Sequence, residues 1–194
     1  MKSIIENAAR LTNYGEVKVA VKNAKGYLTL ADNAKLDSLQ EGDIINFDIA
    51  AEGEFATFAN AVFNAKPDAG AVVFAAPKYL LELANKGVTI PPILDDFAQI
   101  VGATLKVAKN TQSISKAIKG RNGCMISGKG VAISGRTLDE AATALLVAEK
   151  AAKTYVLAVP LGGAKPVPMW EAKLMNYIYA KKYSKKDQDI KMSE

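Results

Sequence analysis

The sequence has no histidine and only one cysteine in 194 residues. Imidazole is the usual general base near neutral pH and the commonest protein ligand for zinc. Its absence excludes Ser-His and Cys-His nucleophile pairs and histidine-bound metals. The lone Cys124 can form neither an intrachain disulfide nor a thiolate-rich zinc site. Carboxylate sites, lysine chemistry and binding through the backbone remain.

Long apolar runs are also missing. None approaches the ~20 residues needed to span a bilayer, and the first segment, MKSIIENAARL, carries charges where a signal peptide would be apolar. Because nothing in the sequence requires an oxidising compartment, we predict a cytoplasmic protein with no membrane span.

Positive charge is concentrated near the C-terminus. Part of the net charge of +5 comes from the segment KKYSKKDQDIK, whereas the rest of the chain mixes lysine with aspartate and glutamate. A nucleic-acid-binding surface needs a basic face with interleaved aromatic residues, so we predict no nucleic-acid partner. The 49% hydrophobic content supports one sizeable core. We therefore expect a single domain over residues 1–180 and a basic, solvated tail over residues 181–194.

Hydrophobic periodicity predicts alternating helices and strands, and hence an α/β fold. Two helices are expected to open with Ser/Thr-x-x-Glu capping boxes, at residues 3–6 and 137–140. Another is expected to have Pro77 at its first position and Gly87 just past its end. The expected helices cover residues 3–13, 55–66, 77–86, 113–119, 137–159 and 170–182; the expected strands cover residues 16–22, 27–30, 45–50, 71–76, 124–127 and 131–134, and one short helix and one strand fall between 95 and 109.

Three features are candidates for a functional site. Glycines flank Lys129, so the backbone can approach another group closely there, although the triplet lacks the full spacing of a phosphate loop and an exposed turn lysine is the alternative. Carboxylates near element ends can divide acid and base roles or bind Mg²⁺, although capping or surface positions are their commoner use. These carboxylates are Glu52, Glu54, Asp95 and Asp96. Cys124 lies in an expected strand among apolar residues, which favours a buried thiol over a reactive one.

Two long segments carry a family resemblance. PDAGAVVFAAPKYLLELANKGVTIPPI and AIKGRNGCMISGKGVAISGRTLDEAATALLVAEKAAKTYVLA resemble the class II aldolase and adducin head domain family, which includes fuculose- and rhamnulose-phosphate aldolases. The run GRTLDEA at residues 135–141 matches the family's Gly-(Lys/Arg)-Thr-Leu-(Asp/Glu)-Glu-Ala helix start throughout. The similarity covers about residues 3–160 and is most specific over 55–160. It implies a three-layer α/β/α fold around a largely antiparallel sheet, assembled as a tetramer with pockets between subunits.

The residues that carry the family's chemistry are replaced in this chain. The resemblance implies a divalent metal held by three histidines, and the matching positions hold Phe74, Ala76 and Lys129. The family's acid/base glutamate falls on Phe55, with Glu54 one position away and so about 100° round the helix. These replacements lead us to predict that the protein uses no metal and no cofactor.

The family's phosphate-binding residues are replaced as well. Its Gly-Asn-Leu-Ser reads GEVK at residues 15–18, so a carboxylate stands where an anion would bind. Its Ser-Ser-Glu reads GEF at residues 53–55, and its Thr-Pro-Ser-Gly has no counterpart near residues 30–33. Aromatic and small residues in place of polar ones are typical of a cavity that has been filled.

These departures favour a non-catalytic member of the family that acts as a homo-oligomer or as a subunit of a paralogue. One alternative is a metal-independent aldolase or lyase, in which Lys129 supplies a fixed positive charge or forms a Schiff base. Another is a module that binds a sugar or carbonyl compound in the reshaped pocket. The predicted ligand-binding residues are Lys129, Phe55, Phe74, Ala76 and Glu54, and Lys129 is also the catalytic candidate.

Overall fold

The computed structural model describes residues 1–24, 26–48 and 53–191. Helices and strands alternate along the chain much as expected. The helices are α1 Lys2–Leu11, α2 Glu54–Ala65, α3 Lys78–Asn85, α4 Asp95–Ile100, α5 Ile114–Ile118, α6 Leu138–Ala158 and α7 Met169–Lys191. The strands are β1 Val17–Asn23, β2 Gly26–Leu30, β3 Ile44–Phe47, β4 Ala71–Ala75, β5 Val107–Ala108, β6 Gly123–Ile126 and β7 Gly130–Gly135. Positions 49 and 50 of the expected third strand lie outside the described residues.

The strands form one sheet in the order β3-β2-β1-β4-β7-β6-β5. Every neighbouring pair is antiparallel except β5 and β6, which are parallel. The β1–β2 hairpin confirms the predicted pairing of those two segments. The central β4 is buried on both faces, as its unbroken apolar run AVVFA predicts. The prediction of a largely antiparallel sheet is therefore confirmed.

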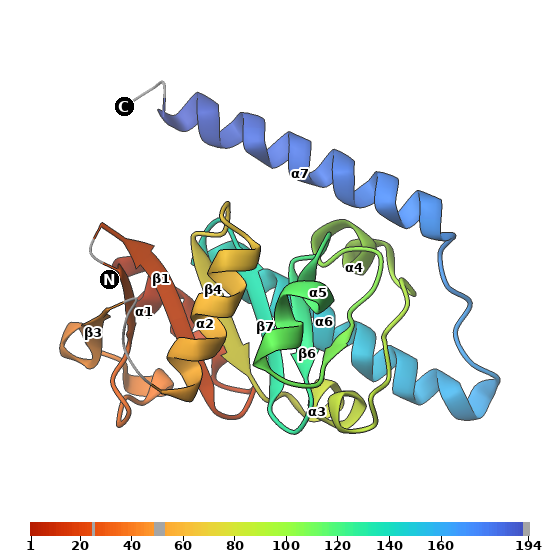
Figure 1. The fold of residues 1–194 in the computed structure, drawn as a ribbon, viewed down its shortest axis with the longest axis horizontal. Helices are drawn as coiled ribbons and strands as arrows, with labels where there is room; N and C mark the ends of the chain where they lie inside the picture. Colours follow the sequence, from red (N-terminus) through yellow and green to blue (C-terminus); the bar gives the residue numbers. More distant parts are fainter. Residues whose placement is uncertain (25, 49–52, 192–194) are drawn as a thin grey trace.

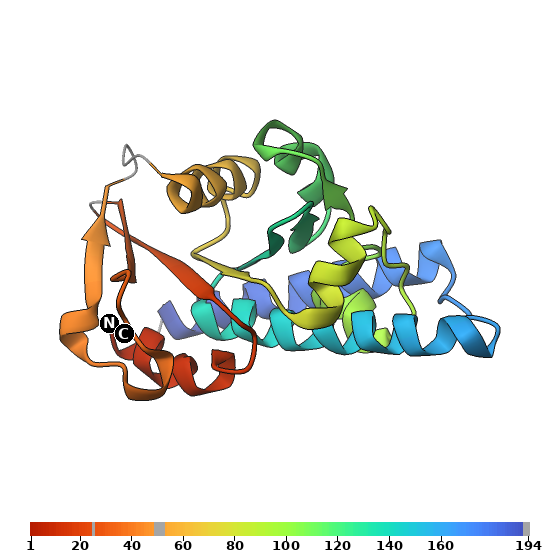
Figure 2. The ribbon, with the colours of Figure 1, turned by 90° about the horizontal axis from the view of Figure 1, so that it is seen from below.

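Helices cover both faces of the sheet, which makes three layers (Figures 1 and 2). On one face, Val19, Val73 and Ile133 belong to the larger hydrophobic core, which α1, α3, α4 and α6 complete. On the other face, Val72 and Ala132 pack with side chains of α2 and α5 in a second core. The α/β/α layering predicted from the resemblance is confirmed.

Two predicted helix starts, those of α1 and α3, differ in detail from the structure. α1 begins one residue early, with Met1 as its N-cap and no side-chain cap, because Ile4 N–H already bonds to the Met1 carbonyl. The capping box at residues 3–6 is therefore wrong. Pro77 is the extended N-cap of α3 and not its first helical residue, although Gly87 does adopt the left-handed conformation, with φ of 67°, expected past the end.

The capping box at residues 137–140 forms only by half. The Thr137 hydroxyl accepts the Glu140 N–H at 3.2 Å, as predicted. The Glu140 carboxylate, however, accepts the backbone N–H of Arg136 at 2.9 Å and pairs with the Arg136 guanidinium. The Glu140 carboxylate thus binds the backbone N–H of Arg136, the residue before the N-cap, and not the N–H of Thr137, as a full capping box requires.

The last helix, α7, is longer than predicted. It continues through Lys191, so the expected end at Lys182 is wrong, and the division of the chain at residue 180 stays a prediction. α7 packs on α4 through a small core of Ala98, Ala103 and Ala172, and Figure 1 shows it running along one end of the sheet. No helix in the described part of the chain is both long and apolar enough to cross a membrane.

Candidate functional site

The turn between β6 and β7 presents Lys129. Lys129 N–H donates to the Ile126 carbonyl at 3.0 Å, which closes the turn, and Gly128 N–H donates to Asn85 Oδ1 of α3 at 3.1 Å. Gly128 and Gly130 both have positive φ, 74° and 124°. Gly130 lies so close to the Ala75 carbonyl of β4 that no side chain would fit between them. Gly130 therefore serves a close backbone approach, as the sequence suggested, whereas a Cβ at Gly128 would meet nothing within 4 Å.

The Lys129 ammonium points back over the sheet to α2. Its Nζ lies 2.8 Å from Oε1 of Glu54, the first residue of α2. Both side chains are about half exposed and line a cavity of about 560 Å³. Lys129 is thus neither free in solvent nor buried without a partner.

Four of the five predicted ligand-binding residues line this cavity together. They are Glu54, Phe55, Phe74 and Lys129. The Phe74 ring stacks on Phe58 of α2, with centroids 5.5 Å apart and planes 26° apart. Ala76, the residue after β4, is not among the lining residues. Glu52 lies outside the described residues.

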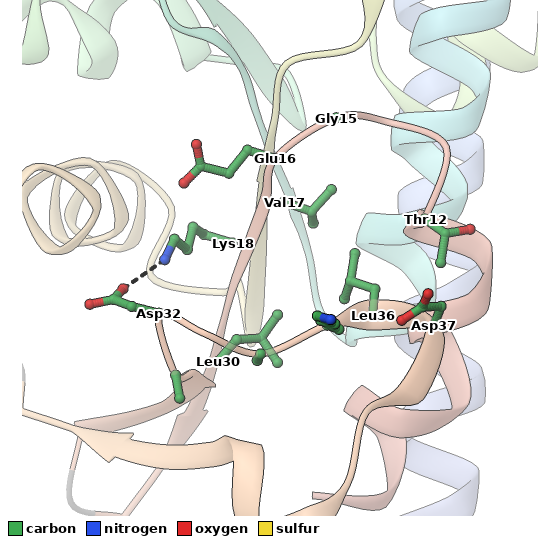
Figure 3. A pocket seen from close by; sticks show the side chains of 12 residues that line it. Thr12, Gly15, Glu16, Val17, Lys18, Leu30, Asp32, Leu36 and Asp37 are labelled. Atoms are coloured by element: carbon green, nitrogen blue, oxygen red, sulfur yellow. Dashed lines mark hydrogen bonds and ion pairs between the residues drawn. The ribbon is translucent and has the colours of Figure 1, made fainter.

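A second ion pair across the cavity was not predicted. Lys18 of β1 donates to Oδ1 of Asp32 at 2.8 Å, and the hydrogen bond and charge of Lys18 lower the pKa of Asp32. Figure 3 shows Glu16 and Lys18 projecting to one side of β1 and Val17 to the other, beside an adjoining cavity of about 420 Å³. The alternation in EVKVAVK places Glu16 and Lys18 on one face, but nothing local in the sequence points to Asp32.

The charges around the larger cavity sum to a negative value. Its lining includes the two ammonium groups of Lys18 and Lys129 and three carboxylates, those of Glu16, Asp32 and Glu54. Each ammonium group already has a carboxylate partner. The arrangement therefore disfavours a phosphate group, which needs cationic groups or N–H donors that are not already paired with carboxylates.

One buried polar group faces the same cavity without a partner. Thr29 of β2 lines the cavity, is only 3% exposed, and its Oγ1 has no hydrogen-bond partner among the described residues. A buried hydroxyl left unbonded costs about 1–3 kcal/mol. A ligand that reached this hydroxyl would remove this cost.

The residues at the three histidine positions do not fit a divalent metal. Phe74 offers a ring already stacked on Phe58, Ala76 offers only a methyl group, and the Lys129 ammonium is a hydrogen-bond donor paired with Glu54. In the described ranges no three His, Cys, Asp or Glu side chains lie close enough together to hold a metal ion. The family's metal chemistry therefore has no ligand set at these positions.

The other sequence candidates lie away from this cavity. Asp95 and Asp96 are in the first turn of α4, where negative charge stabilises the helix, and Asp96 also pairs with Lys150 of α6. Cys124 is fully buried in β6, and this burial raises the pKa of its thiol to about 12. The thiol is thus a small core side chain, as predicted, and is poorly suited to act as a nucleophile.

The layers and the sheet order define a three-layer α/β protein with a mostly antiparallel sheet. The sequence profile of the class II aldolase and adducin N-terminal domain family matches residues 12–156. The chain belongs to this family, which confirms the resemblance drawn from its two long segments. No curated protein sequence matches it at a significant level.

Solved structures share the fold at low sequence identity. An L-fuculose 1-phosphate aldolase is 20% identical, with 92% of this chain and 95% of that chain covered and a TM-score of 0.81. The L-fuculose-1-phosphate aldolase of Thermus thermophilus is 15% identical, covers 82% and 94%, and has a TM-score of 0.71. YgbL of Escherichia coli is 15% identical, covers 90% and 96%, and has a TM-score of 0.75. At these identities the likeness concerns the fold alone.

Proposed function

We propose that this protein is a class II aldolase-like protein without metal-dependent aldolase activity, and that it acts by associating with a second copy of itself. The observation that carries the first half is the Lys129–Glu54 ion pair, at 2.8 Å, where the family's metal chemistry would be. The Lys129 ammonium, paired with the Glu54 carboxylate, stands at one of the three histidine positions of the family. The residues at the other two positions, Phe74 and Ala76, are apolar. The fully buried Cys124 requires no oxidising compartment, so we place the protein in the cytoplasm.

The ion pair also argues against Schiff-base chemistry. Nucleophilic attack on a carbonyl needs a neutral amine, whereas the contact with Glu54 uses the ammonium form of Lys129. The half-exposed position leaves water around both groups and gives no dry site in which the amine could react. Lys129 is therefore proposed as a structural link between the β6–β7 turn and α2.

An aldol-cleavage assay tests this half of the proposal. Purified protein with L-fuculose 1-phosphate or L-rhamnulose 1-phosphate, in turn with Zn²⁺, Co²⁺ and Mn²⁺, is expected to release no aldehyde above the background of Lys129→Ala. Borohydride reduction in the presence of dihydroxyacetone or glycolaldehyde is expected to leave the mass of the protein unchanged. Metal-dependent turnover, or an adduct that Lys129→Ala loses, refutes the proposal.

The second half rests on the outer face of α7. Of the ten large hydrophobic side chains exposed in the described residues, eight fall within residues 157–178. Trp170, Leu174, Tyr177 and Ile178 repeat at helical spacing and are 70%, 48%, 55% and 56% exposed. Ala172, on the opposite face of α7, is fully buried against α4. A contiguous apolar stripe on the exposed face of a helix supports a protein interface.

A second copy of the chain is the occupant that best fits this stripe. Trp170 and Ile178 lie four residues before and after Leu174, so two α7 helices packed antiparallel bring Trp170 of one copy against Ile178 of the other. Such a twofold contact is self-complementary and closes on itself. The family resemblance likewise implies an oligomer.

A second candidate function is small-molecule binding in the cavity of about 560 Å³. The unpartnered Thr29 hydroxyl is the observation that favours it. Thr29→Val should raise the stability of the free protein by about 1 kcal/mol, because valine has a similar shape and removes the unbonded hydroxyl. The same variant should lose any rise in Tm that small sugars or carbonyl compounds produce in the native protein. A Tm rise that Thr29→Val retains in full counts against this candidate.

A further inference from the structure

A second polar cavity lies at the other end of the sheet from Lys129. It has a volume of about 190 Å³ and is bounded by residues just before β4, the end of β7 and part of α7. Ala71 pairs with Gly135 at this end, whereas Ala75 pairs with Val131 near the Lys129 turn. Four residues of strand separate the two ends by about 13 Å. Figure 1 shows α7 at one end of the sheet and α3, which anchors the Lys129 turn, at the other.

Among the side chains that the structure describes, the titratable groups lining this cavity carry excess positive charge. Glu140 is neutralised by Arg136, with Nη2–Oε1 at 2.5 Å and Nε–Oε2 at 3.2 Å. The remaining charged groups are Lys66, Arg121 and the exposed carboxylate of Asp68, and Tyr179 contributes a neutral phenol. Two cations thus face one solvated carboxylate.

Lys66 and Arg121 are held in place by neutral acceptors. Lys66 Nζ donates to Oδ1 of Asn122 at 2.8 Å. Arg121 Nε donates to Thr104 Oγ1 at 2.8 Å, and its Nη1 donates to two backbone carbonyls at 3.2 and 2.5 Å. These bonds fix the guanidinium and use three of its five N–H groups, which leaves Nη2 for another acceptor. Burial lowers the pKa of Arg121, and an anion beside the guanidinium would offset that cost.

We propose that this cavity binds a small phosphate-class anion, either inorganic phosphate or a phosphate monoester of two or three carbons, between Arg121 and Lys66. A planar guanidinium with a free N–H edge and an ammonium group suit the oxygens of such an anion. The volume corresponds to about six water molecules, so a phosphate ion with a short carbon chain fits. The site is separate from the Lys129 cavity and independent of the function proposed for it.

Thermal unfolding of the full chain at constant ionic strength tests this proposal. Titration with inorganic phosphate, and in a second arm with glycerol 3-phosphate, is expected to raise Tm along a saturating curve, by about 5 °C at a hundredfold excess over Kd. The arm with the tighter half-saturation identifies which of the two sources the site prefers. Arg121→Gln and Lys66→Gln are each expected to raise the ligand concentration at half-saturation at least tenfold. For each variant, the rise in Tm is measured from its own Tm without ligand.

Lys116→Gln is the matched control, because it removes a positive charge from an exposed side chain five residues before Arg121 that does not line the cavity. It should bind as the native protein does. If Arg121→Gln does not fold, Lys66→Gln carries the comparison, since Lys66 lies at the end of α2 and is only partly buried. No saturable rise in the native protein, or an equal rise in the native protein and both site variants, overturns the proposal.

Discussion

Gly130→Ala is expected to lower the free energy of unfolding by about 3 kcal/mol or more, because an added Cβ would stand where the β4 backbone already lies. The Cβ would be 2.2 Å from the Ala75 carbonyl oxygen and 2.9 Å from Ala76 Cα. Neither atom belongs to a flexible side chain, so β4 or β7 must shift. Gly130 also has φ of 124°, a conformation that alanine rarely adopts. Urea unfolding followed by circular dichroism measures the change.

Gly128→Ala is the matched control, on the other side of Lys129. Gly128 has φ of 74°, but a Cβ there would meet nothing within 4 Å. Only the backbone cost of about 1 kcal/mol should appear. Equal losses in the two variants would contradict the close approach of the turn to β4, and with it the position given to Lys129.

Leu174→Glu is expected to convert the protein from an oligomer to a monomer of 20.6 kDa. A carboxylate in the centre of the α7 stripe would be buried against the second copy without a partner, at a cost of about 3–5 kcal/mol, which is more than a hundredfold in the association constant. The stripe is fully on the outer face of α7, so the fold of each chain should be unchanged. Light scattering after size exclusion, at several concentrations, measures the mass.

Lys173→Glu provides the control for this variant. It also introduces a glutamate in α7, but at an exposed position outside the stripe. It should leave the oligomer intact. A native protein that is monomeric at all concentrations, or a Lys173→Glu variant that dissociates as far as Leu174→Glu, would refute the association proposal.

The fold was largely predictable because its strongest signals are local. The run AVVFA has no polar residue and becomes the central β4, and GRTLDEA contains the Thr137 cap that starts α6. The end of α7 was missed because KKDQDIK contains no glycine or proline to stop a helix, and charge alone does not end one. The start of α1 was missed because Ser3 offered a plausible cap while Met1 could begin the turn equally well.

The candidate site was predictable in its members but not in its contacts. Family positions pointed to Phe74 and Lys129, and both line the cavity. The pairing of Lys129 with Glu54, 75 residues earlier, depends on the register of β4 against β7 and on where α2 crosses the sheet. The pairing of Lys18 with Asp32 depends in the same way on the path from β2 to the next strand. Such contacts follow from tertiary packing, which a single sequence does not encode locally.

Calorimetric titration with Zn²⁺ tests the central claim most directly. The native protein is expected to show no one-to-one binding, because Phe74, Ala76 and Lys129 offer no metal ligand. A variant with Phe74→His, Ala76→His and Lys129→His provides the positive control and is expected to bind one Zn²⁺ per chain, since imidazole is then present at all three positions. Stoichiometric Zn²⁺ binding by the native protein, accompanied by cleavage of a sugar phosphate, would contradict the claim that this chain has left the family's metal chemistry.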